Sequence, residues 1–396
     1  MTSPSETVPA RREARWGAAL ELLAEVRRDP GLTRAEAAHR IGLSSGSATE
    51  ITARLRAVDL LVETPAPISG RGRPTTTLRP HPHGPLVAAI DLRYEDWRCA
   101  LAQLDGRLEP VVSKRHGGGD GEPVLREIAA TLRDLRQRYG RRLRAVSIAV
   151  SGTVRHGRLV QAAALGWGAV DLAKILPDRA LPLLIGNDAT LAGLAEARQG
   201  AGLGSNTVLH LTVEVGIGGV LVVGGNPISG SGGAAGEYGH LPFGDRALSC
   251  PCGAQGCWDM EVDGRALARH LGAPPPADPR QYARAVLADA QSDDSARTAV
   301  RQVAIALSSG IAGLVNAHDP DVVTLGGLAG AIRDAAEPDF DAAYLRGLMT
   351  FRRHDPTPLR PAALGQDGSL SGAAASALDL VLCEEGLNAW AADAAR

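Results

Sequence analysis

The sequence predicts an α/β protein in two parts: a small, mainly helical N-terminal unit and a larger body in which strands and helices alternate. Its 396 residues are too many for one ordinary hydrophobic core. The chain is 44% hydrophobic and contains 47 glycines, a composition typical of a folded α/β protein with many tight turns. Beyond residue 84, runs typical of strands and helices alternate.

Three helices are predicted in the first 60 residues. Apolar residues at helical spacing over residues 16–26 predict the first helix. Thr33, with Glu36 three residues later, has the pattern of a capping box for a short second helix. Ser44 is expected to cap the third helix. The buried stripe of that third helix is predicted to be Ile51, Leu55 and Val58.

The second and third helices have the spacing of a helix-turn-helix, whose second helix enters the major groove of DNA. Polar side chains near the start of the third helix would then meet base edges, and an arginine farther along would meet phosphates. These candidate DNA contacts are Ser45, Ser47, Thr49, Glu50 and Arg54. The same pattern also fits a plain three-helix bundle, so the helices alone leave both interpretations open.

The segment that follows favours DNA binding. Residues 60–63 and 75–78 resemble two strands, joined by a turn containing Gly70-Arg71-Gly72-Arg73-Pro74. Glycine permits close approach of a backbone, and arginine is attracted to narrow minor grooves. Arg71 and Arg73 are therefore candidate DNA contacts. Residues 1–80 are predicted to form a winged helix-turn-helix for double-stranded operator DNA. Aromatic residues, at 3%, are too few for stacking on single-stranded nucleic acid.

Two segments of the body begin with a similar, strand-rich stretch of sequence. Strands are predicted at 86–91 and 146–150, a helix at 189–198, and further strands at 208–213 and 220–223. The strand-rich starts near Leu86 and Thr207 predict two related lobes with a cleft between them.

A cluster of cysteines predicts a metal site. Three cysteines in the pattern Cys-x-Cys-x4-Cys are preceded, ten residues earlier, by a histidine. Three thiolates and one imidazole form a closed tetrahedral set suited to one structural Zn²⁺ per chain. The expected ligands are His240, Cys250, Cys252 and Cys257. The alternative is three unrelated thiols in a glycine-rich loop.

Several ordered motifs resemble the ROK family of repressors and sugar kinases. They are Leu165-Gly166-Trp167, Gly186-Asn187-Asp188, Gly216-Ile217-Gly218-Gly219, Ala235-Gly236-Glu237-Tyr238-Gly239-His240, the cysteine cluster, Gly70–Pro74, Asp319-Pro320, Gly326-Gly327 and Gly372-Ala373-Ala374. The resemblance spans about Leu20 to Leu380. It implies a two-lobed, actin-like, sugar-kinase-like body. Its first lobe would comprise residues 84–185 and about 372–396, and its second lobe residues 186–371, with a zinc loop at 240–257.

The resemblance also implies a sugar or sugar phosphate in the interlobe cleft. Asn187, Asp188, Glu237 and His240 would hold its hydroxyls, and the other ring nitrogen of His240 would bind zinc. The family usually places a glutamate two residues after the last cysteine as a further sugar contact. This chain has Asp259 there, which leaves the identity of the sugar open.

The phosphate-binding motifs of the family's kinases are altered. In those kinases the first strand ends in Asp-x-Gly-Gly-Thr, whose amides cradle phosphate. Here residues 91–95 read Asp-Leu-Arg-Tyr-Glu, and the second phosphate loop, residues 214–218, begins with Glu instead of carrying threonine. A carboxylate about 4 Å from a phosphate charge costs roughly 4 kcal/mol at a dielectric of about 20. The chain is therefore expected not to be an enzyme. Asp188 would remain as a hydroxyl acceptor, or as a helix N-cap.

The main hypothesis is a sugar-responsive bacterial transcription repressor that binds an inverted-repeat operator as a homodimer or a dimer of dimers. Two alternatives remain: an active sugar kinase with an added DNA-binding domain, and a ligand-independent DNA-binding or assembly protein. A cytoplasmic location without a membrane partner is expected. No targeting helix is recognised, and the longest apolar stretch, residues 303–317, is too short to cross a bilayer.

Overall fold

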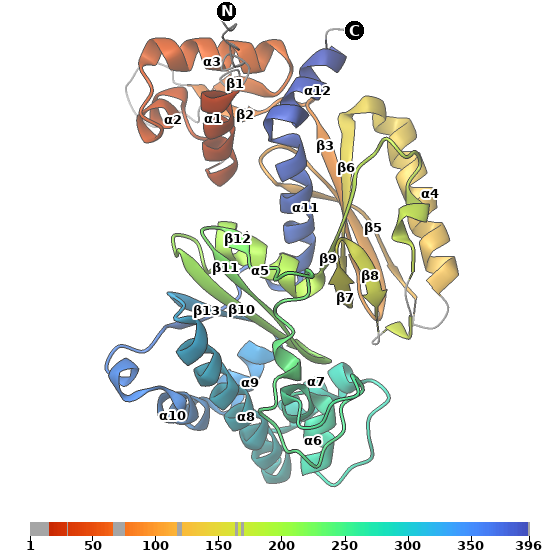
Figure 1. Cartoon of the computed structure of the whole chain (residues 1–396), viewed down its shortest axis with the longest axis vertical. Coiled ribbons are helices and arrows are strands. Elements are labelled where there is room, and N and C mark those ends of the chain that lie inside the picture. The colour runs from red at the N-terminus through yellow and green to blue at the C-terminus, as the bar shows by residue number, and fades with distance from the viewer. Residues whose placement is uncertain are drawn as a thin grey trace, which may run out of the picture.

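A computed structural model describes residues 16–29, 31–65, 76–116, 121–162, 165–167 and 170–394. Within these ranges an N-terminal unit is followed by two five-stranded sheets, and two helices end the chain (Figure 1). The predicted DNA contacts Arg71 and Arg73 lie outside the described residues.

The N-terminal unit has three helices and one antiparallel hairpin. The predicted capping box is confirmed: the Thr33 hydroxyl accepts the Glu36 N–H, and the Glu36 carboxylate accepts the Thr33 N–H. Ser44 caps the third helix by accepting the Ser47 N–H, also as predicted. The elements are α1 (Gly17–Arg28), α2 (Arg34–Arg40), α3 (Ser45–Ala57), β1 (Leu61–Pro65) and β2 (Thr76–Pro80).

Helix α3 buries a stripe that differs from the predicted one. The buried residues are Ala48, Thr52 and Leu55, whereas Ile51 and Val58 are half-buried. Leu55 belongs to both stripes, so the predicted face is displaced around the helix rather than reversed. The contacts of α1 and α2 with α3 select the observed face.

Each lobe is built on a sheet with the same topology. In both sheets the first strand pairs antiparallel with the second and parallel with the fourth, so the predicted duplication is confirmed. The first sheet, in the order β5-β4-β3-β6-β9, contains β3 (Leu86–Leu92), β4 (Asp96–Ala102), β5 (Leu108–Arg115), β6 (Leu143–Val150) and β9 (Leu183–Asn187). The second, in the order β12-β11-β10-β13-β14, contains β10 (Thr207–Glu214), β11 (Gly216–Val223), β12 (Asn226–Pro227), β13 (Val322–Gly327) and β14 (Leu359–Pro361).

Both faces of the first sheet are covered. Alternate residues of a strand point to opposite faces. Leu86 and Ile90 therefore pack on the side of α4 (Gly121–Tyr139), while Val87 and Ala89 pack on the side of α11 (Gly368–Val381). A small hairpin, β7 (Thr153–Arg155) and β8 (Arg158–Gln161), follows β6.

The second lobe is organised around its longest helix, α8 (Asp294–His318). This helix contains the apolar stretch 303–317. Judged by length and composition only, it could cross a membrane. However, 61% of its most apolar window is buried, and Leu307 and Ile311 belong to the core of the lobe. The other helices are α6 (Gly264–His270), α7 (Pro279–Asp289), α9 (Ala329–Ala335) and α10 (Glu337–Gly347).

Two helices connect the lobes, and their backbones are in direct contact. Helix α5 (Asp188–Gln199) follows the last strand of the first sheet, and α11 follows the last strand of the second. A Cβ atom on Gly372 would lie 1.8 Å from the carbonyl oxygen of Leu191. Only glycine permits this approach of α11 to α5.

The N-terminal unit is held by the C-terminal helices, with α12 (Glu384–Ala394) beside it (Figure 1). The Trp390 Nε1 donates to the Val58 carbonyl oxygen at 2.6 Å, and the Trp16 Nε1 donates to the Asn388 Oδ1 at 2.9 Å. Both indoles are buried in one core with α11.

We expect Gly372→Ala to lower the free energy of unfolding by about 1–3 kcal/mol, the usual range for overpacking, because α5 and α11 must separate. Gly330→Ala in α9 is the matched control, since nothing lies within 4 Å of its added Cβ, and it should be neutral or slightly stabilising. Urea denaturation of both variants measures the difference. Equal stability of the two variants would contradict the close contact.

Candidate functional site

The predicted sugar residues Asn187 and Asp188 lie where β9 ends and α5 begins. Asn187 is the N-cap of α5: its side-chain oxygen accepts the Thr190 N–H at 3.0 Å, and its amide nitrogen donates to the Gly152 carbonyl oxygen at 3.1 Å. Asp188 is the first helical residue and accepts the Ala189 N–H at 2.8 Å. The interpretation of Asp188 as the N-cap is therefore wrong, because the preceding asparagine fills that position.

Asp188 has an environment that disfavours its charge. Burial raises the pKa of Asp188 to about 6, and the charge of Asp91 contributes to the rise. The Ser151 Oγ, which donates to the Asp188 Oδ2 at 2.5 Å, and the Ala189 N–H act in the opposite direction and lower this pKa. Asp188 can therefore gain or lose a proton in the mildly acidic range and can both donate to and accept from a hydroxyl group.

The two ring nitrogens of His240 face different groups. Nε2 lies 3.9 Å from the Glu237 carboxylate, while Nδ1 lies 3.8 Å from the Cys250 Sγ and 3.6 Å from the Asp259 carboxylate. Glu237 and His240 stand at either end of a short 3₁₀ turn and are both exposed. This histidine can therefore bind a metal through Nδ1 and present Nε2 to another ligand.

A small cavity brings Asn187 and Glu237 together. Its volume is about 30 Å³, and its lining residues are Val154, Asn187, Thr190, Gly218, Gly219, Gly233, Ala234, Ala235, Gly236 and Glu237. That is enough for a water molecule, whereas ligand pockets usually measure about 300–1,000 Å³. Asp188, His240 and Asp259 do not line the cavity.

Asp259 is turned away from this cavity. Its Oδ1 accepts the Ile217 N–H at 2.6 Å, and the residue is 9% exposed. A Cβ atom on Gly239 would lie 1.9 Å from the same oxygen, and one on Gly216 would lie 2.8 Å from it. Asp259 therefore ties the start of β11 to the segment that contains His240.

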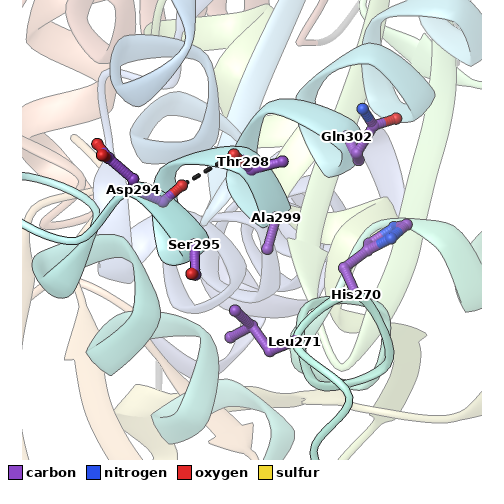
Figure 2. Close-up of a pocket in the computed structure, with 7 residues that line it drawn as sticks. All are labelled: His270, Leu271, Asp294, Ser295, Thr298, Ala299 and Gln302. Carbon is purple, nitrogen blue, oxygen red and sulfur yellow. Dashed lines mark hydrogen bonds between the residues drawn. The ribbon is translucent and has the colours of Figure 1, made fainter.

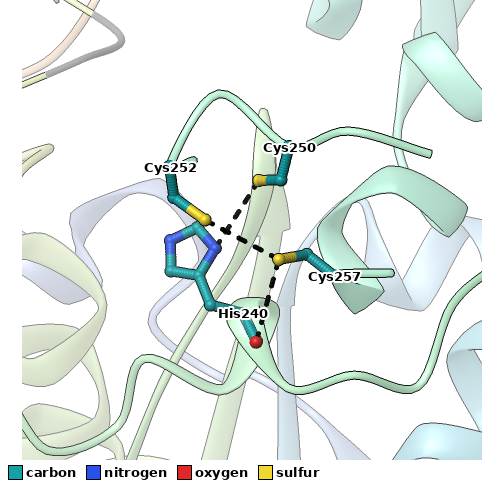
Figure 3. A group of neighbouring side chains, drawn as sticks. All are labelled: His240, Cys250, Cys252 and Cys257. Atoms are coloured by element: carbon teal, nitrogen blue, oxygen red, sulfur yellow. Dashed lines mark hydrogen bonds between the residues drawn. The ribbon is translucent and has the colours of Figure 1, made fainter. Parts of the chain in front are cut away.

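Four side chains form a candidate metal centre (Figure 3). His240, Cys250, Cys252 and Cys257 place one ligand atom each within 4.8 Å of one another. The Cys252 and Cys257 sulfurs are 3.7 Å apart. Tetrahedral zinc with Zn–S bonds of about 2.3 Å requires sulfurs about 3.8 Å apart, so the cluster fits this ion. All four protein positions are filled, as in a structural site.

The two altered phosphate loops are joined by an arginine from α7. The Arg280 Nη1 lies 3.1 Å from the Glu95 carboxylate in the first lobe, and the Arg280 Nη2 donates to the Glu214 carboxylate of the second lobe at 3.2 Å. Arg280 also forms an ion pair with Glu214 through Nε. Burial raises the pKa of Glu214, and the charge of Arg280 opposes that rise. A cation of the chain itself thus lies between the two carboxylates.

Asp91, at the end of the first strand, is buried and paired. The Arg98 Nη2 donates to it at 2.8 Å, and the Arg93 Nε lies 3.7 Å away. Burial raises the pKa of Asp91, while both arginines oppose the rise. Arg98 also contacts Asp367, at the start of α11, at 2.6 Å. The first altered phosphate loop is therefore fixed by internal ion pairs.

The predicted DNA contacts that the structure describes lie on α3. Ser45, Thr49 and Glu50 are exposed, and Ser47 is half-buried. The Arg54 guanidinium lies over the Trp16 ring, 5.0 Å from its centroid. Polar side chains thus stay open at the start of α3, whereas Arg54 is engaged within the N-terminal unit.

A second cavity, of about 430 Å³, opens between the end of α6 and the start of α8 (Figure 2). Its lining residues are His270, Leu271, Asp294, Ser295, Thr298, Ala299 and Gln302, and none of them is a predicted site residue. The Thr298 hydroxyl donates to the Asp294 carbonyl oxygen within α8. This cavity is thus separate from the predicted interlobe site.

Sequence reasoning missed Ser151 and Arg280. Ser151 follows β6 and carries no recognisable motif, although it contacts Asp188 across 37 residues of sequence. Arg280 lies 185 residues from Glu95 and 66 from Glu214. One signal in the sequence pointed to Arg280: two carboxylates, Glu95 and Glu214, stand in the predicted phosphate loops and need a nearby cation.

Stability should depend on pH through Asp188. Burial raises the pKa of folded Asp188 to about 6, above its ordinary value of 3.8. The folded state therefore binds the proton more tightly, and stability falls as pH rises through about 4 to 6. The shift corresponds to a cost on the order of 3 kcal/mol at neutral pH. Asp188→Asn should remove this dependence and raise the melting temperature at pH 7.5. In Ser151→Ala the fall in stability should extend to higher pH, because the Ser151 hydrogen bond that lowers the pKa of Asp188 is lost. A pH–stability profile unchanged by Asp188→Asn would contradict the assignment.

Comparison with known proteins places these features in a family. Residues 87–379 match the model of the ROK family. The chain is 32% identical to a kanosamine kinase of Amycolatopsis mediterranei over 269 residues, which cover 66% of this chain and 85% of that protein. It is 29% identical to a glucokinase of Streptomyces coelicolor over 272 residues, covering 64% of this chain and 85% of the kinase.

A solved structure extends the similarity of fold to nearly the whole chain. It is a ROK family transcriptional regulator, described as a homologue of the E. coli MLC protein. It superposes with a TM-score of 0.71 at 21% identity and covers 95% of this chain and 98% of its own. Because the family model covers about three quarters of the sequence, the chain belongs to the ROK family.

Proposed function

We propose that this protein is a sugar-responsive transcription repressor that binds an inverted-repeat operator as a homodimer or a dimer of dimers. The N-terminal unit is the observation that carries the proposal. Its α3 exposes Ser45, Thr49 and Glu50 at the end that would enter a major groove. Arg71 and Arg73, in the segment of sequence between β1 and β2, would add contacts to the minor groove.

The effector is proposed to be a sugar or sugar phosphate held between the lobes. Asn187, Asp188, Glu237 and His240 would bind its hydroxyls, and Asp259 would act through the loop it anchors rather than by direct contact. Two family relatives are named as a glucokinase and a kanosamine kinase, so D-glucose and kanosamine are the first probes to use. Binding of either must widen a cavity of about 30 Å³. The ligand would therefore change how the lobes meet.

The alternative of an active kinase is less well supported. Phosphoryl transfer requires positioned phosphates and stabilised charge. Here Glu95 and Glu214 lie on the two loops that hold phosphates in related kinases, and Arg280 already bridges them. A nucleotide would have to displace this ion pair and meet two carboxylates. We therefore propose that the protein has no kinase activity; ATP turnover with D-glucose above background would contradict this.

One structural Zn²⁺ per chain is proposed for the cluster of His240 and the three cysteines. Bound there, the ion would fix His240 through Nδ1 and leave Nε2 beside Glu237. The metal would thus order the effector site without taking part in chemistry. A cytoplasmic location is proposed with this, because thiolate sites suit a reducing compartment.

Operator binding and sugar response should be separable. An operator is first selected from a random duplex pool, and binding is followed by fluorescence anisotropy. Replacing Arg71 and Arg73 by Ala should weaken operator binding at least tenfold without changing sugar binding. Asp188→Asn and Glu237→Gln should keep operator binding but lose most of the sugar response. Glu109→Gln, an exposed carboxylate on β5, is the control. If the site variants lose DNA binding while still folded, the modular proposal is wrong.

Metal loss should weaken the effector site. We expect elemental analysis to give one zinc per wild-type chain and much less in Cys252→Ser, because a closed four-ligand site loses one thiolate. Sugar affinity, followed by thermal shift, should fall with the metal through His240. Cys383→Ser, which alters a thiol that does not belong to the cluster, is the control. Unchanged sugar affinity in the zinc-free protein would show that the loop does not support the site.

A further inference from the structure

One carboxylate joins three helices that belong to different parts of the fold. Asp379 lies in the last turn of α11. Its Oδ1 accepts from the Arg27 Nη1 at 3.0 Å, and its Oδ2 accepts from the Arg198 Nη1 at 2.7 Å. Arg27 belongs to α1 of the N-terminal unit, and Arg198 belongs to the last turn of α5. Asp379 therefore lies where the body meets the N-terminal unit.

Both arginines are held by a second contact. The Arg27 Nη2 donates to the Ala375 carbonyl oxygen on α11 at 3.2 Å, and the Arg198 Nε donates to the Gly225 carbonyl oxygen at 2.8 Å. Each guanidinium is thus oriented before it reaches Asp379, which reduces the entropy lost in pairing. A carboxylate at a helix C-terminus is disfavoured by the helix dipole, so Asp379 depends on these cations.

Helix α5 connects the proposed effector site to this carboxylate. The helix begins beside Asn187 and Asp188 and reaches Arg198 in its last turn, so one rigid element carries both ends. Its backbone at Leu191 is also in direct contact with Gly372 of α11. A displacement of α5 by a ligand at its first turn must therefore move Arg198 relative to Asp379, or move α11 with it.

We propose that Asp379 is a positioning residue that transmits the state of α5 to α1. By holding one oxygen of Asp379, Arg198 orients the other oxygen towards Arg27 and thereby sets how firmly α1 is held against α11. The identity of the ligand and the operator rests on the proposed function, whereas the contacts of Asp379 with Arg27 and Arg198 do not depend on it. Asp379 itself touches neither the proposed sugar site nor the face of α3 proposed for DNA.

The exposure of these side chains limits the effect to a modest one. The side chains are 21% exposed for Arg27, 26% for Arg198 and 44% for Asp379. Ion pairs exposed to this degree change equilibria by about two- to fivefold. The buried indoles of Trp16 and Trp390 hold the N-terminal unit whether or not Asp379 is present. Asp379 therefore adjusts the position of the unit and is not needed for its attachment.

The first test needs neither sugar nor operator. Amide hydrogen exchange is measured in the full-length protein over α1 and the last turn of α5. The variants are Asp379→Asn, Arg27→Gln, Arg198→Gln and the double variant Asp379→Asn with Arg198→Gln. Asp339→Asn is the matched control, because Asp339 forms one ion pair with Arg301 within the second lobe.

We expect Asp379→Asn to speed exchange in α1 and in the last turn of α5 by about two- to fivefold. Arg198→Gln should also speed exchange in α1, although Arg198 does not touch that helix. In the Asp379→Asn background the same substitution should leave α1 unchanged, which is the mark of coupling through Asp379. No increase in α1 exchange on Arg198→Gln, or an equal increase in both backgrounds, would overturn the proposal. If Asp379→Asn fails to fold, the Arg198→Gln result alone decides.

The second test uses D-glucose and the selected operator. Asp379→Asn should keep its sugar affinity and its sugar-free operator affinity within about twofold, while the sugar-induced change in operator affinity shrinks by about two- to fivefold. An undiminished response would overturn the transmitting role. Wild-type protein whose operator affinity never responds to sugar would contradict the proposed function instead, and the exchange cycle would still decide whether Asp379 couples α5 to α1.

Discussion

The contact between α5 and α11 is the constraint on which the rest of the structure depends. These helices are the crossings between two sheets of the same topology, and they meet where Gly372 lies against the backbone of Leu191. Because a side chain is excluded there, the helices cannot slide past each other freely. The packed pair of helices runs from the proposed effector residues, at the first turn of α5, to the N-terminal unit, at the last turn of α11.

Arg280 dominates the electrostatics where the two lobes meet. It pairs with Glu95 of the first lobe and with Glu214 of the second lobe and so links the two. Asp91 is satisfied in a similar way by Arg98. In the proposed function, a sugar would then need only to shift the balance between this arrangement of the lobes and another one.

Asp259 joins the candidate metal loop to the start of β11. Its carboxylate accepts the Ile217 N–H and lies close to His240, so the cysteine cluster, the histidine and the glycine-rich turn form one continuous segment. The close approach of its carboxylate requires glycine on both sides, because a Cβ atom on Gly216 or Gly239 would clash with it.

The sequence by itself determined the features that depend on neighbours within a few turns of chain. The Thr33 and Ser44 caps, the strands that start each sheet and the order of the cysteine cluster follow from local hydrogen bonds, periodicity and spacing. The Asn187 cap of α5 is equally local, although the sequence pattern also allowed Asp188 as the cap. The tertiary structure alone decided that Asp259 turns inward to the Ile217 N–H. It also selected Arg280 and Asp379, whose partners lie 66 to 352 residues away. In a chain rich in arginine, any carboxylate has many candidate partners, and only the packing of the sheets and connecting helices brings a particular pair within reach.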